Sequence, residues 1–355
     1  MMKWIKAALA AVVVAIGAVA GLGYYAMEQL KPAAAGDEVV FTIPEGASSS
    51  DIAEALEENG IIRDALIFQY YLRYKNIGTG FQAGTYAMAP GTDLQEIIRK
   101  LNAGETVAEE TLRATIPEGF TARQAIDALV ELGFSEEELS ALAADPWQFA
   151  ESSVGGQPPR AASIPRHDQY RYPIEGYLFP ETYEFPLDAT AYEVVLRMAQ
   201  ELDRKLATLP EGWEKQLEAN GVTFHEMMTI ASLVEREVVV DEERPLVAGV
   251  IYNRIAADMP LQIDATVQYL FDEPKERLFE SDLKIESPYN TYLNDGIPPG
   301  PIASPGLASI EAALYPEPSD YLFYVTKKDG SGEHYFGKTY DEHLRNIERS
   351  NANVK

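Results

Sequence analysis

The sequence has 355 residues, of which 46% are hydrophobic, so it is long enough to bury a sizeable core, and its length favours two domains over one. Lys and Arg together number 29 and Asp and Glu 56, which gives a net charge of −27 at pH 7. This charge argues against a nucleic-acid-binding protein, because the phosphates would be repelled. The absence of Cys excludes disulfides, thiolate metal sites and cysteine nucleophiles.

An uncharged segment lies near the N-terminus, from Ala7 to Met27, and follows Lys3 and Lys6. A helix needs about 20 apolar residues to cross a bilayer, so this segment predicts a transmembrane anchor. The lysines before it place the N-terminus in the cytoplasm and the body of the protein outside. A cleaved signal peptide is the alternative, but the length of the segment favours an uncleaved anchor. Residues 1–30 therefore form a cytoplasmic stub with the anchor, and 31–36 form a linker.

The motif Thr-Ile-Pro-Glu-Gly occurs twice, at 42–46 and at 115–119. Each copy predicts a strand, a Pro-Glu-Gly turn, a helix that opens with a capping box, and a glycine that ends the helix. Such a repeat is most simply structural. The predicted capping boxes are Asp51 with Glu54 and Thr121 with Gln124, and the predicted helix ends are Gly60 and Gly133.

Between the two copies, the pattern predicts a helix at 68–74, a strand at 84–88 and a helix at 94–101 that ends near Gly104. Residues 37–105 are therefore expected to form a small α+β unit. Its functional interpretation is a glycan-binding module.

The C-terminal part predicts a mixed α+β domain. A Gly- and Pro-rich segment at 152–172 indicates a loop or mobile insertion, and a turn-rich segment follows at 282–305. Gly330 and Gly332 suit a hairpin turn between two strands. Helices are expected at 192–206, 224–237, 246–256, 307–314 and 340–349, and strands at 321–325 and 334–336.

The helix that ends in Glu-Arg-Glu carries the strongest candidate for catalysis. Ile230, Leu233 and Val234 define a buried stripe, and Glu237 continues it, whereas Glu235 points to roughly the opposite side. Burial raises the pKa of a carboxyl group, which suits a general acid near neutral pH. The alternative is an exposed helix end, with both glutamates paired to nearby arginines.

Three further segments group polar and aromatic side chains that suit a ligand rich in hydroxyl groups. One of them leads into a Pro- and Gly-rich loop at 296–306, whose rigidity would hold its side chains at low entropic cost. Another, at 173–183, is equally consistent with a structural corner. The candidate binding residues are Gln262, Asp264, Thr266, Tyr289, Asn290, Thr291 and Glu175.

Motifs for metal and cofactor chemistry are missing from the sequence. His225 and Glu226 begin a zinc-protease motif, but Thr229 stands where its second histidine belongs. The four histidines are scattered, and neither a phosphate-binding glycine loop nor a nucleophile-elbow serine occurs. We therefore expect neither a metal nor a cofactor.

Several of these segments, together with the N-terminal anchor, resemble the YceG-like family of murein transglycosylases. The resemblance extends from the anchor to near the C-terminus, and the order of its motifs along the chain makes it specific. The motifs are Ala231–Glu237, Tyr252–Arg254, Leu261–Asp264 with Thr266, and Tyr289–Tyr292 leading into 298–303.

The resemblance implies an enzyme that cleaves peptidoglycan glycan strands internally at the MurNAc-β-1,4-GlcNAc bond and leaves 1,6-anhydro-MurNAc ends. It implies a LysM-like subdomain at 37–105 and a catalytic domain at 106–355, anchored in the bacterial inner membrane with the catalytic domain outside the cytoplasm. The family's catalytic glutamate lies in the Glu-x-Glu segment, which indicates Glu237, with Glu235 in reserve. Glycan strands are the expected partners, together with the membrane and, as candidates, peptidoglycan synthases.

Glu237 alone could run this reaction, first as acid and then as base. Two other functions remain open. A hydrolytic muramidase would use water and a second carboxylate, for which Asp264 is the candidate. A non-catalytic, membrane-tethered scaffold would bind the wall, or organise its synthesis, without cutting it.

Overall fold

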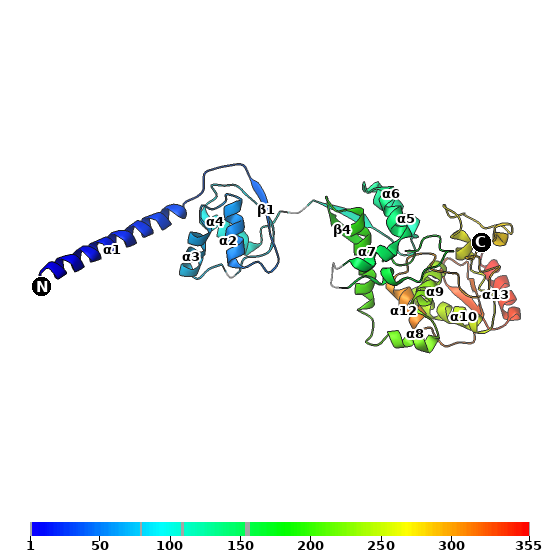
Figure 1. Ribbon diagram of the computed structural model, residues 1–355. Helices are drawn as coiled ribbons and strands as arrows, with labels where there is room; N and C mark the ends of the chain where they lie inside the picture. Colours follow the sequence, from blue (N-terminus) through cyan, green and yellow to red (C-terminus); the bar gives the residue numbers. More distant parts are fainter. Residues whose placement is uncertain (1, 79, 108–109, 153–156, 355) are drawn as a thin grey trace. The chain divides into compact units, whose positions relative to one another are not determined.

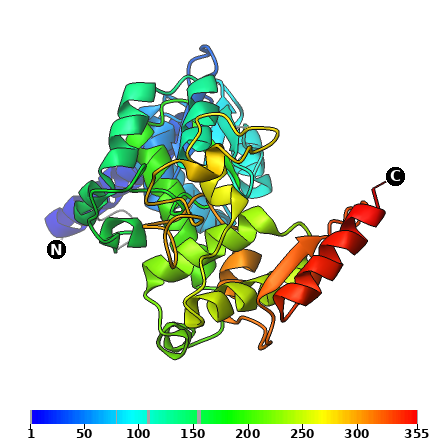
Figure 2. The ribbon, with the colours of Figure 1, turned by 90° about the vertical axis from the view of Figure 1, so that its right-hand side faces the viewer.

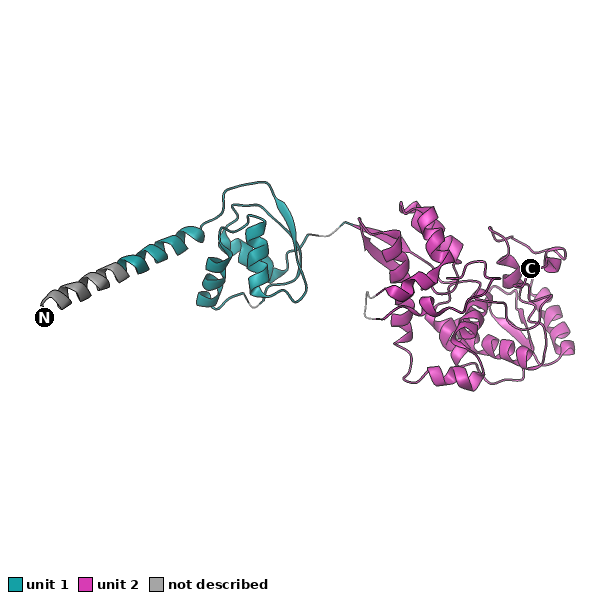
Figure 3. Ribbon diagram, in the orientation of Figure 1, with its two compact units in different colours: residues 1–110 teal, residues 111–355 magenta. Residues whose placement is uncertain are grey.

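The computed structural model describes residues 2–78, 80–107, 110–152 and 157–354, with side chains from residue 16 onward (Figure 1). The chain divides into two compact units, Met1–Glu110 and Thr111–Lys355 (Figure 3). Helices and short two-stranded sheets alternate along the described chain, so the predicted mixed α+β class is confirmed.

The first helix, α1, extends over Met2–Gln29. Several large apolar side chains on it are exposed, among them Val19, Leu22 and Met27. The part of the predicted anchor at 7–15 lies outside the residues whose side chains are described. Among the residues that could be searched, no helix has both the length and the apolar character required to cross a membrane.

The first unit pairs β1 (Val39–Ile43) with β2 (Gly84–Met88) in an antiparallel sheet, and both segments were predicted to be strands. The helices of this unit are α2 (Ser49–Glu58), α3 (Ala65–Lys75) and α4 (Leu94–Ala103). The buried side chains of the unit form a core of their own, and the largest of those that are fully buried are Phe68, Tyr86, Leu56, Ile61, Met88, Ile97 and Leu101.

The predicted capping box of α2 is wrong by one turn. Ser48 is the N-cap and exchanges hydrogen bonds with Asp51, whereas the sequence pattern indicated Asp51 with Glu54. Both pairs satisfy the same spacing rule, so the pattern could not separate them. The second predicted box, Thr121 with Gln124, is confirmed.

The second unit begins with β3 (Thr111–Thr115), which pairs with β4 (Thr182–Pro186), a strand that the sequence analysis did not predict. The helices α5 (Ala122–Glu131), α6 (Glu136–Ala144) and α7 (Ala191–Leu206) follow β3 in the chain, with the short 3₁₀ helices η1 (Pro146–Glu151) and η2 (Arg160–Ser163) between α6 and α7.

The segment 152–172 was expected to be a loop or mobile insertion. Residues 153–156 lie outside the described residues, and much of the remainder packs on the domain. Ile164 is buried, its carbonyl accepts a hydrogen bond from Trp147 Nε1 at 2.7 Å, and the guanidinium of Arg166 lies 4.1 Å from the Trp147 ring centre.

Helix α9 (Phe224–Glu237) lies at the centre of the second unit and has the predicted bounds. Every residue from Met227 to Val234 is buried, so the helix is enclosed on all sides rather than on one stripe. It contacts α10 (Arg244–Ala256), α11 (Asp264–Gln268) and α12 (Leu307–Leu314). Helix α8 (Glu214–Asn220) precedes α9, and the 3₁₀ helices η3 (Asp241–Glu243) and η4 (Asp282–Lys284) complete this part.

The chain ends in a hairpin and a helix. Strands β5 (Phe323–Thr326) and β6 (His334–Gly337) are antiparallel, and Gly330 and Gly332 have positive φ in the turn between them, as predicted. Helix α13 (Tyr340–Ala352) packs along both strands. Figure 2 shows the helix in red beside the orange hairpin.

Candidate active site

Glu237 is the last residue of α9. Val238 takes an extended conformation (φ −116°, ψ 127°) and opens a run of three valines, whose β-branched side chains favour extended chain over helix. The carboxyl group therefore lies at the C-terminal end of the helix, where the helix dipole disfavours negative charge. The local sequence thus places the Glu237 carboxyl group at a helix end that favours its protonated form.

The environment of Glu237 also favours its protonated form. Burial raises its pKa to about 7, and the charge of Asp264 adds to the rise, while a hydrogen bond from Tyr324 and the charge of Arg236 oppose it. The Tyr324 hydroxyl donates to Glu237 Oε2 at 2.9 Å. Burial raises the pKa of Tyr324 well above its ordinary value, so this hydroxyl remains a donor. Oε1 is then the oxygen left to carry the acid proton.

A cleft of about 470 Å³ opens beside Glu237. Two predicted binding residues, Gln262 and Asp264, are exposed in it, and the Tyr292 hydroxyl donates to Asp264 Oδ1 at 2.6 Å. Polar groups and aromatic faces of this kind suit a sugar chain. The lining residues are Arg236, Glu237, Arg254, Leu261, Gln262, Asp264, Tyr292, Tyr324, Val325, Thr326, His334 and His343.

Arg254 fixes two walls of the cleft relative to each other. Its Nε donates to Leu322 O at 2.6 Å, and its Nη1 donates to Pro260 O at 3.1 Å and Leu261 O at 2.7 Å. The neighbouring Asn253 donates to the carbonyls of 319 and 321. The Tyr-Asn-Arg motif therefore ties α10 to the segments that carry Gln262 and Tyr324.

Glu235 lies in a different environment from Glu237. Its side chain is only 7% exposed, so the alternative of an exposed helix end is wrong for Glu235, although the pairing with an arginine is confirmed. Arg244 Nη1 lies 3.2 Å from Glu235 Oε2, and the Gly306 N–H donates to the same oxygen at 3.0 Å. Glu235 is thus a buried ion-pair partner and does not line the cleft around Glu237.

Thr266 and Thr291 are buried and hydrogen-bond each other, with 3.0 Å between their hydroxyl oxygens. The Ile263 N–H also donates to Thr291 Oγ1 at 3.0 Å. Asn290 is fully buried and donates to the carbonyls of Leu283 and Ile285. The protein itself occupies the polar atoms of these three predicted binding residues, so they hold the segments that form the cleft rather than face it.

The remaining predicted binding residues, Tyr289 and Glu175, are buried together away from the cleft lining. The centres of the Tyr269 and Tyr289 rings lie 5.0 Å apart, and the Tyr269 hydroxyl donates to Glu175 Oε2 at 3.0 Å. The Ala122 N–H donates to Glu175 Oε1 at 2.8 Å, and burial raises the pKa of this carboxyl to about 7. For the segment 173–183, the alternative of a structural corner therefore fits this buried cluster better than a role in ligand binding.

Sequence reasoning missed the groups that complete the cleft. Tyr324 and His334 come from the C-terminal hairpin, and His343 comes from α13, about a hundred residues beyond the Glu-x-Glu helix. Alternation along the predicted strands would have placed Tyr324 and Thr326 on one face, but nothing in the pattern directs that face toward Glu237. Among the described residues, no group of three or more His, Asp or Glu side chains is arranged to hold a metal ion.

Replacing Tyr324 by Phe should shift the pH profile of the reaction. The hydroxyl lowers the pKa of Glu237, so its loss raises that pKa further. The limb on which activity falls with rising pH should move to higher pH, and the maximal rate should fall severalfold because the acid is less well oriented. A pH–rate profile of both proteins tests this, and an unmoved limb would mean that the hydrogen bond does not act on the catalytic acid.

These features suit acid–base chemistry: a carboxyl group with a raised pKa accepts a hydrogen bond from a tyrosine at the wall of a polar cleft. A sequence model of the YceG-like family matches residues 41–349. The chain is 37% identical over 312 residues to the endolytic murein transglycosylase of Bacillus subtilis (strain 168), a match that covers 88% of this chain and 84% of that protein.

Two further comparisons agree. A protein of the same name from Streptococcus pneumoniae serotype 2 is 34% identical over 342 residues, which cover 92% of this chain and 61% of that protein. The crystal structure of a YceG-like protein from Listeria monocytogenes matches with a TM-score of 0.59 and 36% identity, over 87% of this chain and 98% of that one. The chain belongs to the YceG-like family and is an enzyme.

Proposed function

We propose that this enzyme is a membrane-anchored, endolytic lytic transglycosylase of peptidoglycan. It cleaves the MurNAc-β-1,4-GlcNAc bond within glycan strands and leaves 1,6-anhydro-MurNAc ends. The observation that carries this proposal is Glu237, a carboxylic acid with a pKa raised to about 7 at the wall of a cleft large enough for sugar residues. The activity named for the Bacillus subtilis and Streptococcus pneumoniae relatives supports it.

The reaction needs only one acid–base group. Glu237 donates the proton of Oε1 to the glycosidic oxygen, and the bond from MurNAc C1 to that oxygen breaks with its electron pair on the departing GlcNAc O4. The MurNAc C6 hydroxyl then attacks C1 and forms the anhydro bridge. The Glu237 carboxylate removes the proton of that hydroxyl, which restores the acid for the next cycle.

The other polar groups of the cleft serve to position the sugar. Gln262 and Asp264 are exposed beside Glu237, and Tyr292 orients the Asp264 carboxylate. This carboxylate also raises the pKa of Glu237 and, being negative, stabilises the positive charge that develops at C1.

The rest of the chain brings the catalytic unit to its substrate. The uncharged segment 7–27, after two lysines, supports a single-pass anchor in the bacterial inner membrane, with the catalytic unit on the outer side. The first unit is proposed to be a LysM-like module that binds glycan strands, and peptidoglycan synthases are candidate partners of the anchored protein.

Mass spectrometry of the products tests the proposal. Purified glycan strands incubated with the full-length protein should yield fragments that end in 1,6-anhydro-MurNAc, together with new internal breaks. Reducing ends in their place would indicate a hydrolase, for which Asp264 in the same cleft is the available second carboxylate. Binding to sacculi without any cleavage would indicate a scaffold. Either result would overturn the lytic assignment.

A further inference from the structure

One face of the C-terminal hairpin forms a wall of the Glu237 cleft. Tyr324 and Thr326 on β5 alternate on the same face, and both line the cleft together with His334 at the start of β6. The strand register places Thr326 directly opposite His334. The threonine hydroxyl and the imidazole therefore lie side by side, next to the tyrosine that holds the catalytic acid.

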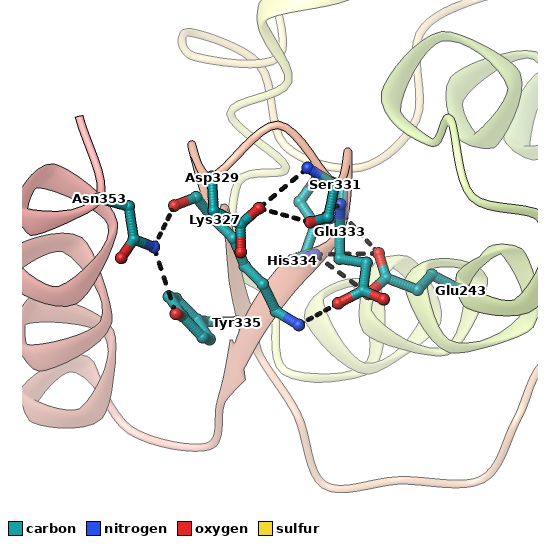
Figure 4. Close-up of polar contacts among 8 residues, drawn as sticks. All are labelled: Glu243, Lys327, Asp329, Ser331, Glu333, His334, Tyr335 and Asn353. Atoms are coloured by element: carbon teal, nitrogen blue, oxygen red, sulfur yellow. Dashed lines mark hydrogen bonds and ion pairs between the residues drawn. The ribbon is translucent and has the colours of Figure 1, made fainter. Parts of the chain in front are cut away.

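Glu243 fixes the orientation and the tautomer of His334. Both carboxylate oxygens accept the His334 backbone N–H, at 3.0 and 3.1 Å, and Oε2 lies 2.7 Å from the ring Nδ1 (Figure 4). A carboxylate can only accept, so Nδ1 carries the hydrogen, and in the neutral ring Nε2 is an acceptor. Within the described parts of the chain Nε2 has no hydrogen-bond partner, so it is available to a ligand.

Contacts around the turn hold the hairpin in this shape. Lys327 pairs with Glu333 across the two strands, and Asn353 donates to the Lys327 carbonyl at 2.6 Å and contacts the Tyr335 hydroxyl (Figure 4). Asp329 accepts hydrogen bonds from the backbone and side chain of Ser331. The pair formed by Thr326 and His334 is therefore preorganised, and a ligand that it binds need not order it.

The two side chains offer complementary groups. His334 Nε2 accepts a hydrogen bond, and the exposed hydroxyl of Thr326, which has no partner among the described residues, can donate one. An amide presents one N–H donor and one C=O acceptor on separate atoms of a rigid plane, whereas a sugar hydroxyl carries both functions on one oxygen that rotates freely. We propose that Thr326 and His334 form a subsite for the acetamido group of an N-acetyl amino sugar. The proposal rests on the proposed function and names the group by which the cleft selects its sugar.

Equilibrium binding of two tetrasaccharides tests the subsite. Tetra-N-acetylchitotetraose carries acetamido groups, and cellotetraose has the same linkage with hydroxyl groups in their place. Calorimetry with the full-length protein should show a preference for the N-acetylated ligand. Thr326→Val and His334→Ala should each weaken its binding about tenfold, equivalent to ~1.4 kcal/mol, and leave cellotetraose binding unchanged.

Two further variants separate recognition from support of the hairpin. Glu333→Gln removes the ion pair with Lys327 on the same hairpin but outside the cleft lining, and it should keep the preference. Glu243→Gln no longer fixes the tautomer, because an amide can donate to Nδ1 as well as accept from it. Nitrogen NMR shifts of the His334 ring should then show the second tautomer, and the preference should weaken. Should His334→Ala fail to fold, Thr326→Val still decides.

The proposal is overturned if the wild-type protein binds both tetrasaccharides equally, or if the variants weaken both ligands alike. These binding tests need no bond cleavage, so their outcome is independent of the product assay. If the products carry anhydro ends but binding is unselective, only the subsite proposal is contradicted. If binding is selective but the products carry no anhydro ends, only the proposed lytic function is contradicted.

Discussion

Replacing Glu237 by Gln is expected to lower the turnover about 10²–10⁴-fold, because the reaction loses both its acid and its base. The fold should remain intact, since glutamine has the same shape and its side-chain oxygen can still accept the Tyr324 hydrogen bond. Release of anhydro-muropeptides from glycan strands measures the effect. Glu242→Gln is a matched control, because it removes an exposed carboxylate from the turn that follows α9.

The pH profile gives an independent check of the same residue. Burial raises the pKa of Glu237 from an ordinary value of 4.5 to about 7, so the active, protonated form prevails below that pH. The wild-type rate should therefore fall about tenfold per unit as the pH rises above 7. A parental rate in Glu237→Gln, or a rate that does not change across this pH, would remove Glu237 from the mechanism.

The same shift predicts how stability depends on pH. A carboxyl group with a raised pKa adds stability that is complete below pH 4.5 and is lost as the pH rises to about 7. Glu237→Gln removes this dependence, so at pH 8 it should be at least as stable as the wild type.

The second large effect is expected at Arg244. Its side chain is 8% exposed and pairs with Glu235, which is 7% exposed, and it also bonds Asp241 and Ser309. Arg244→Met leaves a buried carboxylate without its cation, and loss of one partner of a buried pair destabilises a protein by about 3–5 kcal/mol. Glu118 should increase this loss of stability. Burial and the charge of Glu235 raise its pKa, and the charge of Arg244, which opposes that rise, is lost in the variant. Urea denaturation at neutral pH measures the loss.

The partner variant Glu235→Gln separates the two glutamates of α9. It should lower stability while the pH profile of the remaining activity still falls above pH 7, because that limb belongs to Glu237. If Glu235→Gln instead abolishes turnover with no loss of stability, Glu235 is the catalytic acid and the assignment to Glu237 is wrong.

Local pattern predicted the helix that carries the acid. The apolar spacing predicted the bounds of α9, and the continuation of its stripe predicted a desolvated Glu237, whose pKa is indeed raised by burial. The stripe did not show that Glu235 is buried as well, because one apolar stripe is the pattern of a helix on the surface of a core. Helix α9 is packed on all sides, and only the tertiary structure supplies the neighbours α10, α11 and α12.

Some candidate binding residues are exposed in the cleft and others are buried, and their spacing in the sequence does not show which. Gln262 and Thr266 lie four residues apart, yet the first is exposed in the cleft and the second is buried against Thr291. The difference arises from the turn at Gln262, whose φ is +52°, and from the bonds between 262–266 and 289–292. Tyr324 was missed for a related reason, since it meets Glu237 across 87 residues of sequence.

The contacts that α13 makes with the hairpin have a consequence for the candidate acid. Asn346 donates to the carbonyl of Phe336, Ser350 to that of Thr326, and Asn353 to that of Lys327. The strand that carries Tyr324, which donates to Glu237, is therefore held in place by α13 and the residue that follows it. Loss of these bonds would therefore loosen the tyrosine and, through it, the orientation of the Glu237 carboxyl group.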